Sequence, residues 1–440
     1  MTVLPIRDPG LGNTSYLVDL GDGSALVIDP QRDPSPYLEA AERRNLVIRH
    51  VAETHLHADF VSGARELVAQ GAGLIAPRLA GLAHPHRGVA GGDELALGDF
   101  ILWVVDTPGH TPEHVSFVLY DRSTPLVAFT GGSLSAGGVA RPDLVSDDLT
   151  ETLAHQAYRS VHLLLRALPP HVEIRPTHGG GSFCSSAGVV DGPVSTVGAE
   201  RHNHPAVVAS DAGGFVSDLL AGLGSYPDYF RRLREVNRLG PGTFGVTPPP
   251  LARVPVEDLD DHIVVDVRPI ERFAAGHIPG SVSIELRDQL GTWLGWLFEP
   301  DTSLVFVHDP DQDQRDIVRQ ALNIGHERLA GRIDLDDWLG AGGELVTTDV
   351  VPPVDIPTGA VILDVRQRTE WDRGHVPGAL HVELGDLAKD PTRVPPGVIA
   401  HCGHGQRAMT AASLLARSGR APAGITTAGP ARIATAPALT

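Results

Sequence analysis

Short apolar runs rich in β-branched and aromatic residues alternate with glycine-containing turns over the first 185 residues of the chain. Runs of this length between turn residues are typical of strands. We predict strands at 24–29, 48–54, 100–108, 114–121, 125–131 and 172–179. The helical spacing of apolar positions predicts helices at 35–44, 62–70, 148–168 and within 203–240. The run GPGTFGVTPPP at 240–250 then breaks the pattern, and we predict a domain boundary there.

After this boundary the sequence repeats itself. The stretch VVDVRPIERFAAGHIPGSVSIEL at 264–286 matches ILDVRQRTEWDRGHVPGALHVEL at 362–384, with a constant offset of 98 positions. A copy of this length predicts two related domains and not a solenoid of short repeats. Each copy reads as strand, Asp-Val-Arg turn, helix, Gly-His-hydrophobe-Pro-Gly turn and strand, which predicts a small α/β sheet. The predicted domains are 1–240, 251–345 and 350–440.

Composition and charge narrow the classes of function. The net charge of −19 makes a nucleic acid an improbable partner. No run approaches the roughly 20 apolar residues of a membrane span, and the opening MTVLPIRDPG does not resemble a secretory signal. Two cysteines, Cys184 and Cys402, cannot form a disulfide framework. We therefore expect a cytoplasmic protein with reduced thiols and no membrane partner.

Histidines follow three of the predicted strands. The stretch THLHAD places His55 and His57 on one loop, while TPGHTPEH and RPTHGGG place His110 and His178 after other strands. Neutral imidazoles bind metals well, and strand ends hold them rigidly. We predict a metal site with His55, His57 and His110 as ligands and with Asp59 and His178 as further candidates. The alternative is a set of unconnected histidines, since the chain has 21.

The motifs THLHAD, TPGHTPEH, FTGG and RPTHGGG, in this order, resemble the metallo-β-lactamase fold over roughly residues 1–240. The resemblance implies an αββα sandwich with its metal site at one sheet edge. Within that superfamily, TPGHTPEHVSF and ARPDL are most similar to the persulfide dioxygenases, in which a mononuclear iron oxidises a thiol persulfide to sulfite. This similarity implies that Arg141 lies near the thiol substrate, with a surface ion pair as the alternative.

Two positions depart from the family pattern. Phe60 stands where the motif Thr-His-x-His-x-Asp-His ends in histidine, and Gly132 stands where the family has a metal-binding aspartate. A dinuclear hydrolase site needs both lost side chains, so we expect at most one ion. The resemblance implies mononuclear iron, with zinc as the alternative and an empty site as another, because Gly132 offers no ligand. The substitution Gly132→Asp is predicted to raise the metal content.

The second repeat contains a cysteine between a predicted strand and a predicted helix, in VIAHCGHGQRAMTAASLLARSG. Backbone N–H groups and a helix N-terminus at such a junction favour a thiolate, and Arg407 adds a positive charge. Cys402 and Arg407 are the predicted catalytic residues. The predicted substrate-binding loop consists of Gly403, His404, Gly405 and Gln406. A buried structural cysteine is the alternative.

DVRQRTEWDRGHVPGA followed by CGHGQR resembles rhodanese, a sulfurtransferase family with a persulfide-forming cysteine in a six-residue loop. The similarity covers about 350–420 and implies two rhodanese-like domains with parallel sheets. In the first repeat the corresponding loop reads HDPDQDQRD, so Asp309 lies about where the cysteine belongs. A carboxylate cannot carry sulfur covalently. We therefore predict that the first repeat is catalytically silent, whereas the structure of the tail after Gly419 is left open.

Together these resemblances imply an α/β multidomain enzyme of sulfide detoxification. The leading hypothesis couples persulfide oxidation at a mononuclear metal site to sulfur transfer through Cys402, with thiol persulfides, thiosulfate or sulfite as reactants. Hydrolase-like chemistry at the metal site is a further candidate activity. The alternatives are a sulfurtransferase whose metal domain is only a scaffold, and a non-catalytic persulfide carrier or sensor. The physiological thiol and the oligomeric state, including a homo-oligomer, stay open.

Overall fold

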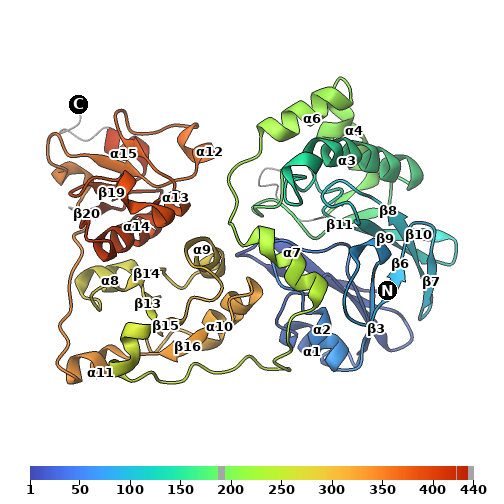
Figure 1. Ribbon diagram of the computed structural model, residues 1–440. Coiled ribbons are helices and arrows are strands. Elements are labelled where there is room, and N and C mark those ends of the chain that lie inside the picture. Colours follow the sequence, from blue (N-terminus) through green and yellow to red (C-terminus); the bar gives the residue numbers. More distant parts are fainter. Residues whose placement is uncertain (187–193, 423, 435–440) are drawn as a thin grey trace. The chain divides into compact units, whose positions relative to one another are not determined.

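The computed structural model describes residues 1–186, 194–422 and 424–434 (Figure 1). These residues form two compact units. One unit comprises residues 1–248 with 322–325, and the other comprises 249–321 with 326–440. The finer division into domains at 240–251 and 345–350 stays a prediction.

The first unit contains two six-stranded sheets. The first sheet has the order β1-β2-β3-β4-β5-β6, with bounds Val3–Asp8, Asn13–Asp19, Ser24–Ile28, Val47–Ala52, Gly73–Pro77 and Arg87–Val89. The second has the order β12-β11-β10-β9-β8-β7, where β7 to β12 are Glu94–Leu97, Phe100–Asp106, Val115–Asp121, Thr124–Gly131, Glu173–Pro176 and Ser195–Thr196. The helices α1 to α7 are Ser35–Glu42, Ala64–Ala69, Asp147–Ala167, Val197–Asn203, Pro205–Val208, Ala212–Ala221 and Phe230–Leu239. Each of the six predicted strands overlaps an observed one.

Alternation along the strands explains the layers of this unit. Tyr16 and Val18 on β2 share a core with Phe117 on β9, so the two sheets pack face to face. The intervening Leu17 points the other way and packs in a core with residues of α1 and α2. The outer face of the second sheet packs in the same manner against α3 and α6. The expected αββα sandwich is thereby confirmed (Figure 1).

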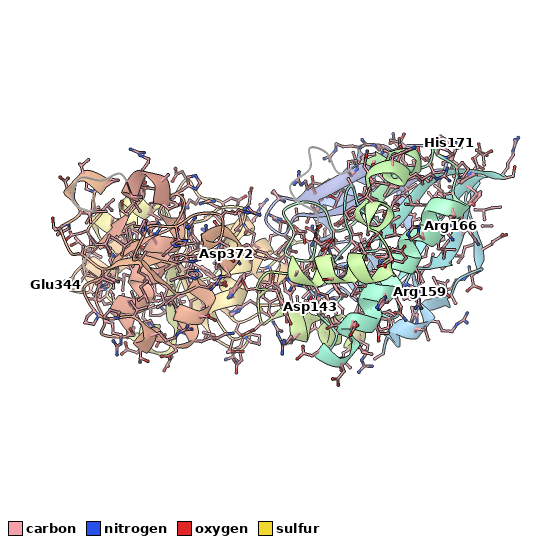
Figure 2. The ribbon with its side chains drawn as sticks, turned by 90° about the horizontal axis from the view of Figure 1, so that it is seen from above. Asp143, Arg159, Arg166, His171, Glu344 and Asp372 are labelled. Carbon is pink, nitrogen blue, oxygen red and sulfur yellow. The ribbon has the colours of Figure 1, made fainter. Side chains whose placement is uncertain are left out.

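Helix α3 illustrates how the outer layer is built. Its first turn carries Asp147 and Asp148, whose charges favour the positive end of the helix. Apolar residues at helical spacing, among them Leu153, are buried against the second sheet. Arg159 and Arg166, which are seven positions apart, lie on the exposed outer side (Figure 2).

The second unit contains two four-stranded sheets, and every strand pair in them is parallel. The first repeat forms the order β14-β13-β15-β16, where β13 to β16 are Ile263–Asp266, Val282–Ser283, Leu304–Val307 and Leu329–Arg332. The second repeat forms β18-β17-β19-β20, where β17 to β20 are Ile362–Asp364, Leu380–His381, Ile399–His401 and Gly424–Thr426. Helices α8 to α11 are Ile270–Ala275, Leu290–Leu297, Gln314–Asn323 and Leu335–Gly340. Helices α12 to α15 are Arg368–Trp371, Leu384–Lys389, Gln406–Arg417 and Pro430–Ala434.

The two repeats share one hydrophobic core. Ile270 and Phe273 on α8 belong to the same buried cluster as Leu363 on β17 and Leu415 on α14. Hydrogen bonds cross between the repeats as well, because the Thr410 hydroxyl donates to the Ser283 carbonyl at 2.6 Å. Burying an aliphatic or aromatic side chain in such a core contributes about 1.5–3 kcal/mol. The repeats therefore stabilise each other.

The tail after Gly419 is ordered into two elements as far as residue 434. Strand β20 pairs with β19 in parallel and completes the second small sheet, and α15 follows it. Within the described ranges, no helix combines the length and the apolar character that crossing a bilayer requires.

Candidate functional site

The predicted metal-binding histidines converge in the first unit. His55 and His57 follow β4, His110 follows β8, and His178 follows β11. All four side chains are buried, with exposed fractions of 1–2%. The Nε2 atoms of His55 and His178 are only 3.1 Å apart, and one ring nitrogen from each of His55, His110 and His178 lies within 4.8 Å of the others. Strand ends far apart in the sequence thus form one cluster.

Hydrogen bonds orient the imidazoles so that Nε2 faces the centre of the cluster. His110 Nδ1 donates to the Arg141 carbonyl at 2.7 Å, and His178 Nδ1 donates to Asn13 Oδ1 at 3.0 Å. His55 Nδ1 contacts Thr54 Oγ1 at 2.8 Å. A proton on each Nδ1 leaves the Nε2 lone pair available, and the buried His110 Nε2 has no hydrogen-bond partner among the described residues. Burial also holds the pKa of His55 and His110 well below its usual value.

His57 is hydrogen-bonded through Nε2, whereas the other three histidines are hydrogen-bonded through Nδ1. Its Nε2 lies 3.0 Å from Glu53 Oε2 and 3.3 Å from Asp29 Oδ1, while its buried Nδ1 has no partner within the described ranges. Burial alone would lower its pKa, but the two carboxylates raise the pKa of His57 to about 10. Binding a metal at Nδ1 would therefore release a proton. His57 also groups with Asp59 and His178 within 4.8 Å.

Asp59 lies beside the cluster and orients it. Its Oδ2 accepts a hydrogen bond from Asn13 Nδ2 at 2.8 Å and lies 3.4 Å from His178 Nδ1. Its buried Oδ1 has no hydrogen-bond partner among the described residues. Burial opposes the charged form, yet the neighbouring His178 and His57 hold the pKa of Asp59 well below its usual value. An ionised carboxylate next to the imidazoles increases their affinity for a cation.

Glycines at 131 and 132 are required by the close approach of His114 and His110. The backbone N–H of Gly132 donates to His114 Nε2 at 2.9 Å, and Gly131 has φ +53°. A Cβ on Gly132 would lie 2.7 Å from His110 Cδ2 and 2.9 Å from Ala140 Cβ. The effect of Gly132→Asp on the metal content stays a prediction, and the His110 ring beside Gly132 argues against an increase, because it occupies space that the carboxylate needs.

Phe60 fills the place of the family's last histidine with apolar contacts. Its side chain is fully buried and stacks on His57, with ring centroids 4.2 Å apart. It also belongs to a buried cluster with Leu11, Tyr229 and Phe230. The same cluster contains Cys184, and burial raises the pKa of this thiol well above its usual value. This side of the site is packed with apolar groups, which disfavours a second ion there.

Arg141 is engaged within the protein. Its guanidinium donates to both carboxylate oxygens of Asp143 at 2.7 Å and to the Gly224 carbonyl at 2.8 Å. It also lies over the Tyr226 ring, 4.5 Å from the centroid. The position of Arg141 near the thiol substrate stays a prediction. Arg141 positions His110 through its backbone carbonyl.

The donor set fits a single metal ion. Among the described residues, the buried His57 Nδ1 and His110 Nε2 have no hydrogen-bond partner, and the Nε2 atoms of His55 and His178 face each other. Such a set suits ferrous iron or zinc. Asn13, Asp29, Glu53 and Thr54 orient these ligands, and the sequence did not single them out. The signal in the sequence is that Glu53 and Thr54 follow β4 directly before His55, while Asp29 follows β3.

The second predicted site lies at the start of α14. Cys402 follows β19, and its Sγ accepts a hydrogen bond from the Gly405 backbone N–H at 3.1 Å. Gly405 has φ +103°, and a Cβ there would meet Thr427 and Ile270 below 3.0 Å. Glycine is therefore required for the loop to close around the sulfur. The hydrogen bond and the helix N-terminus both place partial positive charge beside the Cys402 sulfur.

Arg407 is paired. Its Nη1 and Nη2 lie 2.5 and 2.8 Å from the carboxylate oxygens of Glu370 on α12. The guanidinium also interacts electrostatically with Cys402. Glu370 was not predicted from the sequence, because only the fold brings the two positions together. The pair holds Arg407 beside the loop and offsets part of its charge.

A cavity of about 230 Å³ opens beside Cys402. Of the predicted loop residues, His404 and Gln406 line it together with Arg407 and Thr410, whereas Gly403 shapes the loop. The opposite wall comes from the first repeat, and its residues are Ile284, Glu285, Arg287, Gln289, Leu290 and Trp293. The reactive sulfur therefore faces a cavity that both repeats build.

In the first repeat, Asp309 follows β15 as Cys402 follows β19. Its Oδ1 lies 2.7 Å from Arg272 Nη1 on α8, and its backbone N–H donates to Gln312 Oε1 at 2.8 Å. Pro310 comes next and has no N–H to offer an anion. The loop thus holds a paired carboxylate where the second repeat holds sulfur.

Comparisons with known proteins agree with this architecture. The family model for the metallo-beta-lactamase superfamily matches residues 8–179, and that for the rhodanese-like domain matches residues 253–334 and 355–429. Persulfide dioxygenase ETHE1, mitochondrial, of Homo sapiens is 32% identical over 200 residues, which are 45% of this chain and 72% of that protein. The chain belongs to the metallo-beta-lactamase superfamily and carries two rhodanese-like domains.

Further relatives share parts of this fusion. Hydroxyacylglutathione hydrolase of Cereibacter sphaeroides is 37% identical over 175 residues, covering 38% of this chain and 62% of that protein. A solved structure of a metallo-beta-lactamase from Staphylococcus aureus subsp. aureus COL covers 76% of this chain and 98% of its own, with 29% identity and a TM-score of 0.66. The latter similarity extends beyond the metallo-beta-lactamase domain into the rhodanese-like part.

Proposed function

We propose that the protein is an enzyme of sulfur metabolism that transfers sulfane sulfur through Cys402. The observation that supports this most directly is the Cys402 Sγ, which accepts a backbone hydrogen bond at a helix N-terminus and faces a cavity. In the loading step the Cys402 thiolate attacks the outer sulfur of thiosulfate. The S–S bond of thiosulfate breaks, sulfite leaves, and a Cys402 persulfide remains.

The metallo-beta-lactamase domain supplies the second half of the proposal. Its similarity to a persulfide dioxygenase and its buried imidazole cluster support oxidation of a low-molecular-weight thiol persulfide. One persulfide, one O₂ and one water would give one thiol, one sulfite and two protons. Ferrous iron would supply the oxygen chemistry, held by His55, His110 and His178 with His57 as a further ligand. Zinc is the alternative ion and would favour hydrolase-like chemistry.

The two activities are linked by their chemistry. Sulfite is the product of the proposed oxidation, and it is also an acceptor for the Cys402 persulfide. In that transfer, sulfite attacks the outer sulfur, the Cys402 thiolate leaves, and thiosulfate forms. The coupled reaction would convert persulfide sulfur to thiosulfate. We propose that these reactions take place in the cytoplasm.

The test combines sulfur loading with oxygen uptake. Thiosulfate should add the mass of one sulfur atom to the protein, and Cys402→Ser should abolish the adduct while Cys184→Ser retains it. The iron-loaded protein should consume O₂ when a thiol persulfide is added, and His110→Ala should not. Loading without oxygen uptake would leave a sulfurtransferase with a scaffold domain. Loading without turnover to any acceptor would indicate a carrier, and no loading at all would refute the proposal.

A further inference from the structure

The wall opposite Cys402 is held firmly in place. It begins directly after β14, where the Ser283 backbone N–H donates to the Ser413 hydroxyl at 3.1 Å and the Ser283 carbonyl accepts from the Thr410 hydroxyl. Both partners lie on α14, the helix that starts at the cysteine loop. These two hydrogen bonds fix the backbone that leads into Glu285 and Arg287 against the helix of the cysteine loop.

The cavity beside Cys402 is lined by both acidic and basic side chains. Besides the His404 imidazole, the ionisable groups lining it near Cys402 are Glu285, Arg287 and Arg407. Arg407 is already paired with Glu370. Among the described residues, Arg287 and Glu285 have no ion-pair partner, and Arg287 Nη2 contacts only the neutral Gln289 Oε1 at 3.3 Å. One cation and one anion of the wall are thus left for a ligand.

Of Glu285 and Arg287, Glu285 gives the stronger evidence that the cavity binds a ligand. Its side chain is about half buried, and burial raises its pKa, although Arg287 and Gln406 oppose this. Its Oε2 is buried without a hydrogen-bond partner in the described part of the chain. A buried carboxylate oxygen without a donor costs free energy unless a ligand supplies one. A carboxylate here also repels inorganic dianions, so thiosulfate and sulfite do not account for it.

We propose that this wall, contributed by the silent repeat, selects small thiols that carry both an ammonium and a carboxylate group, of the cysteine type. Glu285 binds the ammonium group and Arg287 binds the carboxylate, which places the thiol at the Cys402 loop. The inference rests on the proposed sulfur transfer and adds the class of organic acceptor. The cavity volume of about 230 Å³ suits a molecule of this size.

The transfer step balances without a further reactant. The thiolate of the acceptor attacks the outer sulfur of the protonated Cys402 persulfide. A new S–S bond forms to the acceptor, the S–S bond to Cys402 breaks, and Cys402 leaves as a thiolate. The product is the acceptor's persulfide, which keeps the proton. Glu285 and Arg287 only position the acceptor and take no part in bond making.

Four acceptor thiols test the ammonium and carboxylate groups separately, because they carry both groups, only the ammonium, only the carboxylate, or neither. The full-length protein is loaded with thiosulfate, freed of excess reagent and mixed with cysteine, cysteamine, 3-mercaptopropionate or 2-mercaptoethanol. Loss of the sulfur adduct by mass spectrometry gives the rate constant. Each variant is compared with wild type for the same thiol, so that differences in thiol reactivity cancel.

Glu285→Gln should lower the second-order rate constant about tenfold for cysteine and cysteamine and leave the other two thiols within twofold. Arg287→Gln should lower it about tenfold for cysteine and 3-mercaptopropionate only. Asp288→Asn is the control, because Asp288 is an exposed neighbour that does not line the cavity. It should change none of the four rates.

The experiment distinguishes a failure of the proposed sulfur transfer from a failure of the proposed thiol selectivity. If Cys402 never acquires sulfur from thiosulfate, the proposed sulfur transfer is refuted and this inference falls with it. If Cys402 loads normally but both wall variants change all four thiols equally, the wall has only a structural role and the inference alone is overturned. Unchanged rates in both variants would overturn it as well.

Discussion

The two rhodanese-like repeats have the same scaffold and different chemistry. In each, a buried Asp at the end of a central strand pairs with the Arg two residues later, at 2.6 Å for Asp266–Arg268 and 2.7 Å for Asp364–Arg366. Each Arg also donates to a glycine carbonyl, that of Gly276 or Gly374. The repeats diverge where the loop after the next strand begins, with Asp309 in one and Cys402 in the other.

The segments that both repeats share make structural contacts, whereas the predicted catalytic cysteine lies outside them. The Asp-Val-Arg and Gly-His-hydrophobe-Pro-Gly segments are the ones that the two repeats share, and their contacts are internal to the turn. A repeat can therefore lose its sulfur-bearing residue without losing its fold. What it retains can be used for another purpose, such as building a wall of its neighbour's cavity.

The largest expected effect concerns the difference between the repeats. Cys402→Ser should abolish thiosulfate-dependent sulfur transfer, because no other residue of the two loops can form a persulfide. In this variant, peptides from 251–345 should show no sulfur adduct after exposure to thiosulfate, as measured by mass spectrometry. A retained adduct in the first repeat would show that it is not silent.

The shared Asp–Arg turns should differ in their sensitivity. Arg268→Ala would take the arginine away from the buried Asp266 carboxylate, and such losses cost about 3–5 kcal/mol. Arg366→Ala should cost less, because His401 Nε2 lies 3.2 Å from Asp364 Oδ2 and stays beside that carboxylate. Chemical denaturation measures the free energy of unfolding of the second unit for the two variants. An equal decrease would show that His401 does not compensate for the lost arginine.

Removing a metal ligand tests the histidine cluster. His55→Ala, His110→Ala and His178→Ala should each weaken metal binding by more than the 10–100-fold that loss of an orienting partner alone produces. Titration with Co²⁺, followed by its visible absorption, measures this without enzyme activity. His84→Ala serves as the control, since His84 is not part of the cluster. Equal binding by His178→Ala and wild type would remove His178 from the ligand set.

Gly132→Asp should weaken metal binding or leave it unchanged, because the new side chain would collide with His110. Its matched control is Gly242→Asp, at a glycine that, like Gly132, lies outside the left-handed region and where an added Cβ meets nothing within 4 Å. Metal content after dialysis distinguishes the outcomes. A variant that binds more tightly than wild type would show that His110 yields its place readily.

The smallest expected effect concerns the pair that only the second repeat has. Burial opposes ionisation of Glu370, but its hydrogen bonds with Arg407 hold its pKa below the usual value. The pair therefore stabilises the folded state above about pH 4.3, and this contribution is lost as the pH falls through the lowered pKa. Glu370→Gln should cost less than about 1 kcal/mol, since Glu370 is one-third exposed. Acid titration of stability should be flatter in the variant.

Much of the fold could be predicted from local patterns. The sandwich strands and the repeated α/β units follow from runs of β-branched residues and from a copied segment. The histidines at strand ends could also be identified from the sequence as candidate metal ligands. Their orienting partners could not, because Asn13 and His178 are 165 positions apart and their contact depends on the packing of two sheets.

The surroundings of Cys402 show the same limit. The loop and its helix could be recognised from the glycines and from Arg407. Glu370 lies 37 positions away on another helix, and Glu285 and Arg287 belong to the other repeat. For Arg141 the motif suggested a position near the substrate, but its contacts with Asp143 and Tyr226 could not be read from the sequence.

The core that joins the two repeats has an evolutionary consequence. Ile270 and Phe273 of the first repeat are buried with Leu363 and Leu415 of the second. A gene deletion that removed the first repeat would uncover this apolar surface and open the cavity beside Cys402. We therefore expect the two repeats to be inherited together and not exchanged as separate modules.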